Sequence, residues 1–365
     1  MHYWDNNIII LIPSLEPDKK LPIYVDQLCE LGLNHILVVD DGSGPSYQSI
    51  FSELETKGCA VLHHEQNQGK GCALKTGLTY IQEKIPGFAC VVTADADGQH
   101  VPEDVLSVAE LSKQHPNALV LGVRDFSGSD VPPKSLIGNH ISAVLFAALY
   151  GKYLSDTQTG LRAFTRKLLR CMMEVRGERF EYEIQMLITC VQMHIPILTQ
   201  PIQVIYENQN KGTHFRPLRD STKVIGTILG SFVRFALASL LGAVVDLGLA
   251  WILLDVLRPL IWDDYLRILL ATAAARVFSI SVNYCINRFV VFRVQSSAEK
   301  SLSRYLLLTA LLMLLSGSGV YVLNTVLQID EKIAKIICDT CLFLLSFRVQ
   351  QKWVFAKRGG TQNGE

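Results

Sequence analysis

The sequence lacks an excess of charge of either sign, because its 365 residues carry 34 Lys and Arg against 34 Asp and Glu. Without a basic excess there is no electrostatic footprint for nucleic acid, which argues against a nucleic-acid partner. Apart from Cys338-x-x-Cys341, which lies inside an apolar segment, it also lacks paired cysteine spacings, so its nine cysteines indicate a reducing compartment rather than a disulfide framework. No basic region precedes the short apolar run 8–12, so we expect no signal peptide and a cytoplasmic first half.

Hydrophobic residues, in contrast, are abundant. They make up 49% of the chain, the mean hydropathy is +0.25, and the excess lies after Ile225. Long apolar segments there predict four membrane spans, at about 235–254, 268–286, 305–327 and 333–349. Residues 217–232 have apolar positions at helical spacing, which predicts an amphipathic helix at the membrane interface.

Basic residues cluster between the second and third spans and after the fourth. By the positive-inside rule, both clusters lie in the cytoplasm. We therefore expect a multi-pass protein of the cell (cytoplasmic) membrane, with both termini and a tail at 357–365 in the cytoplasm. The basic residues are Arg288, Arg293, Lys300, Arg304, Arg348, Lys352, Lys357 and Arg358.

The membrane half contains an internal repeat, since residues 231–237 match residues 301–307 in the pattern Ser-x-x-Arg-aromatic-x-Leu. The repeat indicates two joined hairpins of the same orientation. Asp246, Arg276 and Asp339 lie near mid-span, where charge is costly and usually faces a partner. Arg276 is therefore expected to pair with Asp246 or Asp339, either as a structural pair or as part of a path for a lipid phosphate.

The first half alternates strands and helices. Apolar runs predict strands at 8–12, 36–39, 60–63, 89–93 and 118–122, and helices at about 20–31, 46–57, 70–83 and from Pro102 onward. This alternation is typical of an α/β, Rossmann-like domain with a mostly parallel, doubly wound sheet. Ligands of such sheets bind at the carboxyl ends of the strands.

Charged side chains follow several of these strands. Asp95 and Asp97 come after the fourth strand, and with Gln99 they share one face of an extended backbone. Such oxygen ligands suit Mg²⁺ or Mn²⁺, although an Asp-rich turn is the alternative interpretation. Asp40, Asp41 and Arg124 are expected at the same edge of the sheet, and this shared placement favours a metal and diphosphate site.

Five motifs resemble, in order, those of glycosyltransferase family 2. They are IPS at 12–14, VVDDGS at 38–43, GKGCALKTG at 69–77, DADGQH at 95–100 and DTQTGLRAF at 156–164. Within that family the set is most similar to dolichol- and undecaprenyl-phosphate sugar synthases. The entry at 231–237 and the exit Asn287-Arg288-x-x-Val291-Phe292 resemble the GtrA-like four-span proteins.

The resemblance implies a GT-A catalytic domain at 1–216 and an all-α, four-helix transmembrane domain at 233–356. It implies that Asp40 contacts the base or ribose of a nucleotide sugar, and that Asp95, Asp97 and Gln99 address the ribose and the metal-bound diphosphate. The residues expected to bind the nucleotide sugar are Pro13, Glu16, Asp40, Asp41, Lys70, Asp95 and Ala96.

A phosphate acceptor brings a second anion to this site, which requires basic side chains. A phosphate is largely ionised at neutral pH and needs little help from a base. Asp156 is therefore expected either to act as a base, to orient the acceptor, or only to cap the turn that follows it. The expected catalytic residues are Asp97, Asp156 and Arg124. The expected acceptor or phosphate contacts are Arg124, Lys134, Arg162, Lys211, His214 and Arg216.

Together these features predict an inverting glycosyltransferase that moves a hexose from a UDP- or GDP-linked sugar to polyprenyl phosphate, with UDP-glucose as the first donor to consider. The alternatives are direct glycosylation of a cell-envelope polymer or glycolipid hydroxyl, and a lipid-sugar flippase or scaffold. The membrane helices are also expected to support a homo-oligomer.

Overall fold

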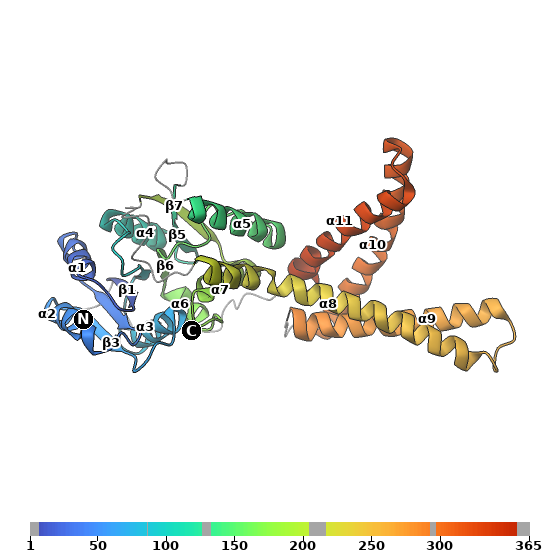
Figure 1. Cartoon of the computed structure of the whole chain (residues 1–365), viewed down its shortest axis with the longest axis horizontal. Helices are drawn as coiled ribbons and strands as arrows, with labels where there is room; N and C mark the ends of the chain where they lie inside the picture. The colour runs from blue at the N-terminus through green and yellow to red at the C-terminus, as the bar shows by residue number, and fades with distance from the viewer. Residues whose placement is uncertain (1–6, 86, 126–132, 204–216, 293–296, 356–365) are drawn as a thin grey trace. The chain divides into compact units, whose positions relative to one another are not determined.

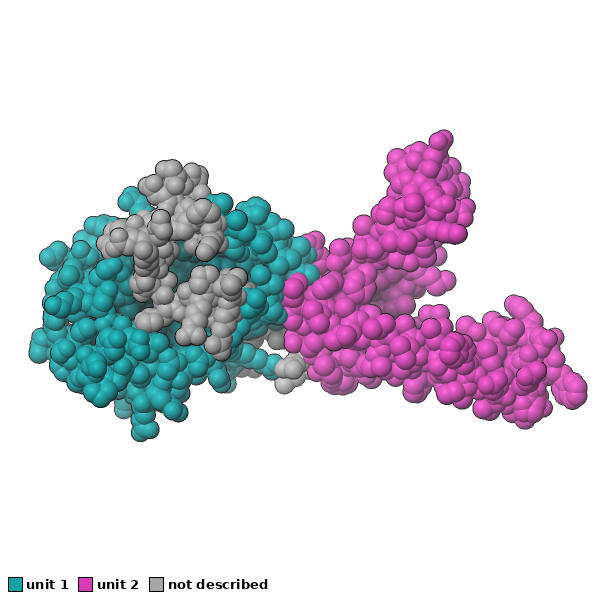
Figure 2. Space-filling model, in the orientation of Figure 1, with its two compact units in different colours: residues 1–228 teal, residues 229–365 magenta. Residues whose placement is uncertain are grey.

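The computed structural model describes residues 7–85, 87–125, 133–203, 217–292 and 297–355. The chain forms two compact units, residues 1–228 and 229–365, coloured teal and magenta in Figure 2. The boundary falls within the long helix α8 (Pro217–Leu257).

The first unit is built on a seven-stranded sheet with the order β3-β2-β1-β4-β6-β5-β7. All neighbouring strands pair in parallel except β6, which runs antiparallel to β4 and β5. The five predicted strands are confirmed, and β6 and β7 are additional. The strands are β1 (Ile8–Ser14), β2 (Ile36–Asp40), β3 (Ala60–His63), β4 (Cys90–Thr93), β5 (Leu119–Arg124), β6 (Arg162–Thr165) and β7 (Ile197–Ile202).

Helices connect these strands, as Figure 1 shows, and several carry clear start signals. Pro102 opens α4 at a position where its missing N–H costs nothing, with two acidic residues in the first turn. The Thr165 side chain caps α6 by accepting from the Lys167 N–H. The elements are α1 (Lys20–Glu30), η1 (Pro45–Tyr47), α2 (Gln48–Thr56), α3 (Lys70–Lys84), α4 (Pro102–Gln114), α5 (Pro133–Tyr150), α6 (Arg166–Met173) and α7 (Glu181–Gln192).

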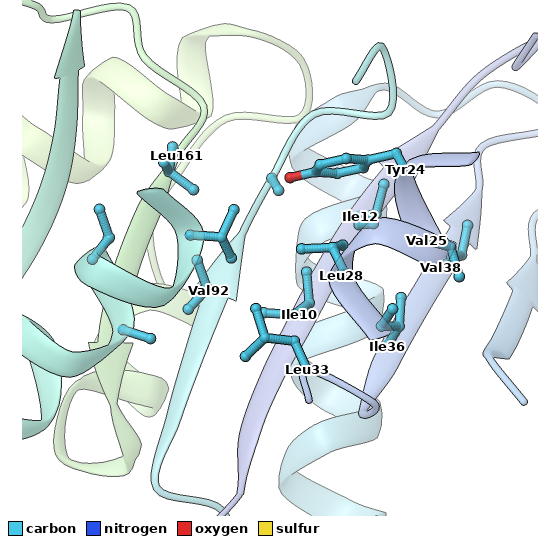
Figure 3. Packing of buried hydrophobic residues seen from close by; sticks show 14 of the residues in the cluster. Ile10, Ile12, Tyr24, Val25, Leu28, Leu33, Ile36, Val38, Val92 and Leu161 are labelled. Carbon is cyan, nitrogen blue, oxygen red and sulfur yellow. The ribbon is translucent and has the colours of Figure 1, made fainter. Parts of the chain in front are cut away.

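The core lies on both faces of the sheet. On one face, Ile10 and Val92 pack with Leu28 of α1, and Figure 3 shows this cluster from close by. On the other face, Gly77 of α3 lies so close to Leu11 of β1 that a side chain there would overlap the leucine. Each fully buried aliphatic side chain contributes roughly 1.5–3 kcal/mol, so this two-sided burial fixes the strand ends in place.

The second unit consists of long helices. Among the described residues, α8, α9 and α10 contain stretches long and apolar enough to cross a membrane, at Thr222–Leu257, Asp264–Val291 and Ala298–Leu327. The protein is therefore a membrane protein. The elements after α8 are α9 (Asp264–Ile286), the π-helical turn η3 (Asn287–Val291), α10 (Ala298–Leu327), α11 (Glu331–Val349) and the π-helical turn η4 (Gln350–Val354).

The predicted fourth span falls on α11. This helix has 19 residues, but it carries too many charged side chains to count among the stretches that are apolar enough to cross a membrane. Its role as a span stays a prediction. The charged side chains are Glu331, Lys332, Lys335, Asp339 and Arg348.

The segment predicted as an interfacial helix, 217–232, is helical. It is continuous with the first predicted span, because α8 runs from Pro217 to Leu257 without a break. It is therefore not a separate helix, and its place at the membrane interface stays a prediction.

The internal repeat appears in the packing of the second unit. Phe292 and Phe355, which follow η3 and η4, stack with their ring centroids 5.2 Å apart. Tyr284 lies 5.8 Å from Phe355, and Phe347 lies 5.8 Å from Phe292. Ring contacts of equal length on the two sides of the stacked pair indicate approximate two-fold symmetry between the hairpins.

The centre of this arrangement is polar. Asn287 at the start of η3 donates to the Gln350 side chain at the start of η4, at 3.1 Å, and both side chains are buried. Beside them, the buried Arg288 donates to the Ser301 hydroxyl. Hydrogen bonds between equivalent turns therefore join the two hairpins.

The mid-span charges pair within each hairpin. Arg276 lies 3.1 Å from Asp246, whose carboxylate also accepts from the Ser279 hydroxyl at 3.0 Å. Asp339 pairs instead with Lys335, at 3.1 Å. Of the two predicted partners of Arg276, Asp246 is therefore the one that Arg276 contacts in the structure. The Arg276–Asp246 pair joins a cation and a carboxylate on two helices that are apolar enough to cross a membrane, where an unpaired charge is costly.

Replacing Arg276 by Ala is expected to lower the stability of the second unit by about 1 kcal/mol, because Asp246 then keeps only a serine partner in the membrane. Thermal unfolding of the full chain in detergent measures this, with the exposed Arg258→Ala as the control. Unchanged stability together with lost formation of lipid product would contradict a purely structural pair.

Candidate active site

The ends of the strands bring the predicted site residues to one edge of the sheet. Because β1, β2, β4 and β5 run in the same direction, Asp40, Asp95 and Arg124 lie where these strands end. Antiparallel β6 begins at this edge, so the loop before it brings Asp156 and Gly160 to the same place. The predicted shared edge is confirmed for Asp40, Asp95 and Arg124, and Asp156 and Gly160 join it from a loop that the prediction did not include.

Asp95 is held by two basic side chains. Lys70, at the start of α3, lies 2.6 Å from Asp95 and 2.8 Å from Glu183 of α7, and so bridges the two carboxylates. On the other oxygen of Asp95, His100 lies at 3.4 Å. Lys70 was predicted to contact the nucleotide sugar, and the structure shows that it orients Asp95.

The two carboxylates differ in their protonation behaviour. Burial raises the pKa of Asp95, but the charges of Lys70 and His100 outweigh it and hold that pKa well below its usual range. Burial and the charge of Asp95 raise the pKa of Asp97. Asp97 is thus the carboxylate that gains most from a divalent cation.

The residues present fit a divalent metal in part. Among the described residues, no group of three or more His, Cys, Asp and Glu side chains is arranged to hold an ion. Two carboxylates and the amide of Gln99 are, however, the donors with which Mg²⁺ or Mn²⁺ binds when substrate phosphates supply the remaining ligands. The Tyr24 hydroxyl is buried and has no hydrogen-bond partner among the described residues. Burial and the nearby charges of Asp95 and Asp97 raise its pKa, so this hydroxyl faces the same two carboxylates.

Gly160 leaves room for Asp95. A Cβ at this position would lie 2.7 Å from Cγ of Asp95, too close for any side chain. The loop is fixed at this distance because the Thr93 hydroxyl at the end of β4 donates to the Gly160 carbonyl at 2.8 Å. The sequence therefore needs glycine here for the loop to pass beside the carboxylate.

The end of β2 forms a second polar centre. Asp40 accepts from the Ser43 N–H at 2.8 Å and contacts Nδ1 of His63 at 2.9 Å. The Ser43 hydroxyl in turn accepts from the backbone N–H of Glu16, at 2.8 Å. These contacts connect the loops after β1, β2 and β3, where a nucleotide base was expected.

Asp41 organises the backbone of a loop. Its carboxylate accepts from the N–H groups of Gln68 and Gly69 at 2.9 and 2.7 Å, and contacts His64 Nδ1 at 2.8 Å. The side chain is only 5% exposed. This geometry indicates that Asp41 holds the loop before α3, and it argues against the predicted contact of Asp41 with the nucleotide sugar.

Arg124 and Asp156 form a bidentate ion pair. The guanidinium Nε and Nη2 lie 2.6 and 2.9 Å from the two oxygens of Asp156, which also accepts from the Gln158 N–H at 3.0 Å. Asp156 is completely buried, whereas the side chain of Arg124 is 20% exposed. The carboxylate therefore presents the guanidinium to the edge of the sheet.

The remaining predicted phosphate contacts have different positions. Arg162 is buried and donates to the carbonyls of Thr159 and Glu183 at 3.0 and 2.5 Å, which argues against its predicted contact with a phosphate. Pro13 is buried within β1, and Ala96 is half-buried beside Asp95. Lys134 lies in the first turn of α5, and its side chain is outside the described part of the chain, as are Lys211, His214 and Arg216.

Three histidines of the site, His63, His64 and His100, were not predicted to contribute, and the contact of Glu183 with Lys70 was not predicted either. The His63-His64 pair ends a strand, and this position is the only signal that could have indicated its contacts with Asp40 and Asp41. His100 lies inside the DADGQH motif, five residues after Asp95. Glu183 stands in an acidic helix start that gives no indication of Lys70.

Comparison with known proteins agrees with this geometry. Residues 9–173 match the family model of glycosyl transferase family 2, and residues 234–355 match that of the GtrA/DPMS transmembrane domain. The chain belongs to glycosyl transferase family 2. It joins the family's catalytic domain, with a mixed α/β sheet of the GT-A type, to a transmembrane domain of the GtrA/DPMS type.

Three relatives are lipid-phosphate sugar transferases by name. The UDP-N-acetylglucosamine–dolichyl-phosphate N-acetylglucosaminyltransferase of Methanococcus voltae is 30% identical over 61% of this chain and 92% of its own. The polyprenol monophosphomannose synthase of Mycolicibacterium smegmatis is 27% identical over 44% and 62%. The undecaprenyl-phosphate mannosyltransferase of Micrococcus luteus is 22% identical over 64% and 95%.

Proposed function

We propose that this protein is a membrane-bound glycosyltransferase that moves a sugar from a nucleotide sugar to polyprenyl phosphate, with inversion at the anomeric carbon. The observation that carries the proposal is the edge where the Asp95–Lys70 and Arg124–Asp156 pairs meet, on a chain with membrane helices. The names of the three relatives support a lipid phosphate as the acceptor.

The donor binds along the ends of β1, β2 and β4 in this proposal. Asp40, held by His63, receives the base or ribose, and Asp95, held by Lys70, addresses the ribose and the diphosphate. A divalent ion bound by Asp97 and Gln99 neutralises charge on the leaving diphosphate. The expectation of glucose is less well supported than N-acetylglucosamine, because the relative with 30% identity is named for UDP-N-acetylglucosamine.

The acceptor phosphate approaches Arg124. Since both oxygens of the buried Asp156 accept hydrogen bonds, the structure favours Asp156 as the residue that orients Arg124 and disfavours it as a base. A phosphate that is already ionised needs no base, so an oriented cation is sufficient. This weighs against direct transfer to a hydroxyl.

The catalytic unit has an apolar surface of its own that suits a lipid acceptor. Ile137, Ile141 and Val144 recur at helical spacing on α5 and are 57%, 43% and 48% exposed. We propose that this face contacts lipid. We also propose that the catalytic unit and both termini are cytoplasmic. The boundaries at 216, 232 and 356 then separate the catalytic, interfacial, transmembrane and tail segments. Assembly of copies through the second unit also stays a proposal.

The full chain, purified in detergent, tests the proposal directly. It is incubated with undecaprenyl phosphate, Mn²⁺ or Mg²⁺, and radiolabelled UDP-N-acetylglucosamine, UDP-glucose or GDP-mannose. We expect labelled lipid with one of these donors and its loss when EDTA removes the metal. Absence of labelled lipid with every donor would overturn the proposed function.

A further inference from the structure

The loop that carries Asp156 joins α5 to antiparallel β6, and the strand pairing of the described residues begins only at Arg162, after this loop. Its backbone groups therefore need other hydrogen-bond partners if Asp156 is to stay in one place. These partners come from one buried face of α5.

Asn139 of α5 is 3% exposed and contacts the loop on both sides of Asp156. Its amide nitrogen donates to the carbonyl of Ser155 at 2.5 Å, and its amide oxygen accepts from the N–H of Thr157 at 3.1 Å. One side chain thus fixes the peptide groups immediately before and after the catalytic carboxylate.

A second contact comes from the next turn of the same helix. The side-chain amide of Gln158 donates to the hydroxyl of Ser142 at 3.2 Å, and Ser142 is 1% exposed. The α5 face that includes Asn139 and Ser142 therefore holds residues 155–158, whereas Ile141 on another face is exposed.

We propose that Asn139 is a positioning residue for sugar transfer: by fixing the loop on both sides of Asp156, it sets the direction in which the Arg124 guanidinium meets the acceptor phosphate. This inference rests on the proposed function, because it assigns the Arg124–Asp156 pair to the acceptor. In this proposal Asn139 acts through its contacts with Ser155 and Thr157 and not by contact with the substrate.

Two properties of the site separate this role from a general effect on folding. In the described part of the chain, the partners of Asp40 and Asp95 come from elements other than α5, and Gly160 beside Asp95 is held separately by Thr93. Loss of Asn139 is therefore expected to leave the binding of the nucleotide unchanged. A small displacement of a reacting group costs up to about 10²-fold in rate, so the effect falls on kcat for transfer.

The test measures transfer to undecaprenyl phosphate by the full chain, together with UDP binding in the presence of Mn²⁺ by calorimetry. We expect Asn139→Ala to lower kcat about 10- to 100-fold while leaving the KM for the nucleotide sugar and the Kd for UDP unchanged. Asn139→Asp replaces the donor to the Ser155 carbonyl by a carboxylate oxygen, which the carbonyl repels, and is expected to lower kcat at least as far as Asn139→Ala.

The matched control is Thr165→Ala. This change also removes a largely buried side-chain donor to a backbone carbonyl, that of Pro116, but away from the Asp156 loop. It is expected to lower thermal stability without lowering kcat. Asn139 variants with wild-type kcat, or with kcat lost in parallel with UDP binding, would overturn the inference.

Failure of the inference and failure of the proposed function give different results. A wild-type chain that makes labelled lipid, together with an unaffected Asn139→Ala variant, rejects the positioning role alone. A wild-type chain that binds UDP and makes no labelled lipid rejects the proposed function, and the inference with it. If Asn139→Ala does not fold, the comparison of Asn139→Asp with Thr165→Ala decides.

Discussion

Sugar transfer by the Asp97→Ala variant is expected to be slower than that of the wild type by on the order of 10³-fold. Asp97 is the carboxylate whose pKa burial and Asp95 raise, so it is the group whose negative charge a bound cation stabilises most. Without it, the leaving diphosphate loses its main charge compensation. Initial rates at saturating donor and Mn²⁺ measure the effect, and calorimetry with Mn²⁺ and UDP measures the lost binding.

The control for this change is Asp26→Asn, which removes an exposed carboxylate paired with Lys57 and is expected to leave the rate unchanged. Protonation provides an independent check. Because the pKa of metal-free Asp97 is raised, protons compete with the metal for this carboxylate already above the usual Asp pKa of about 3.9, and the apparent Mn²⁺ affinity is expected to fall as the pH is lowered through that range. Mn²⁺ affinity that stays constant in this range, or transfer that survives in Asp97→Ala, would contradict the metal role.

The Asp156→Asn variant is expected to lose about 10²-fold in transfer rate while keeping the pH profile of the wild type. The amide has the shape of the carboxylate but no charge, so it holds Arg124 less firmly and in a less fixed direction. A base, in contrast, would contribute an acidic limb to the pH profile, and this limb would disappear with it. The pH dependence of kcat therefore distinguishes the two roles of Asp156.

A double-mutant cycle gives the corresponding control. If Asp156 acts only through Arg124, then Arg124→Ala and the double variant Arg124→Ala/Asp156→Ala are expected to have nearly equal rates. Arg124→Ala alone is also expected to be less stable, by about 3–5 kcal/mol, because it leaves a fully buried carboxylate without its cation. Losses that multiply in the double variant would show that Asp156 has a separate chemical function.

Much of the site could be predicted because it depends on strand order and strand ends. Buried parallel strands have continuous apolar sequences, and the residues directly after them meet at one edge. Asp40, Asp95 and Arg124 each follow such a run, so their shared edge follows from the sequence alone. The motif at 95–100 indicated a metal and diphosphate site from the residue types alone.

The parts that could not be predicted depend on tertiary contacts. Strand β6 begins with the buried Arg162, and a charged residue in a four-residue strand gives no apolar signal. Arg162 itself was predicted to bind phosphate because the sequence does not show the backbone carbonyls to which its buried guanidinium donates. The contact of His63 with Asp40 likewise depends on the register between β2 and β3, which places these two residues opposite each other.

The approximate two-fold symmetry of the second unit means that it is arranged like a homodimer whose two subunits are joined in one chain. In a true homodimer, a substitution changes both halves at once. Here the two halves can carry different residues at equivalent positions: the offset that relates Phe292 to Phe355 also relates Arg276 to Asp339, which have opposite charges. The covalent link also keeps the halves at an effective concentration of about millimolar, so their association does not depend on the amount of protein in the membrane.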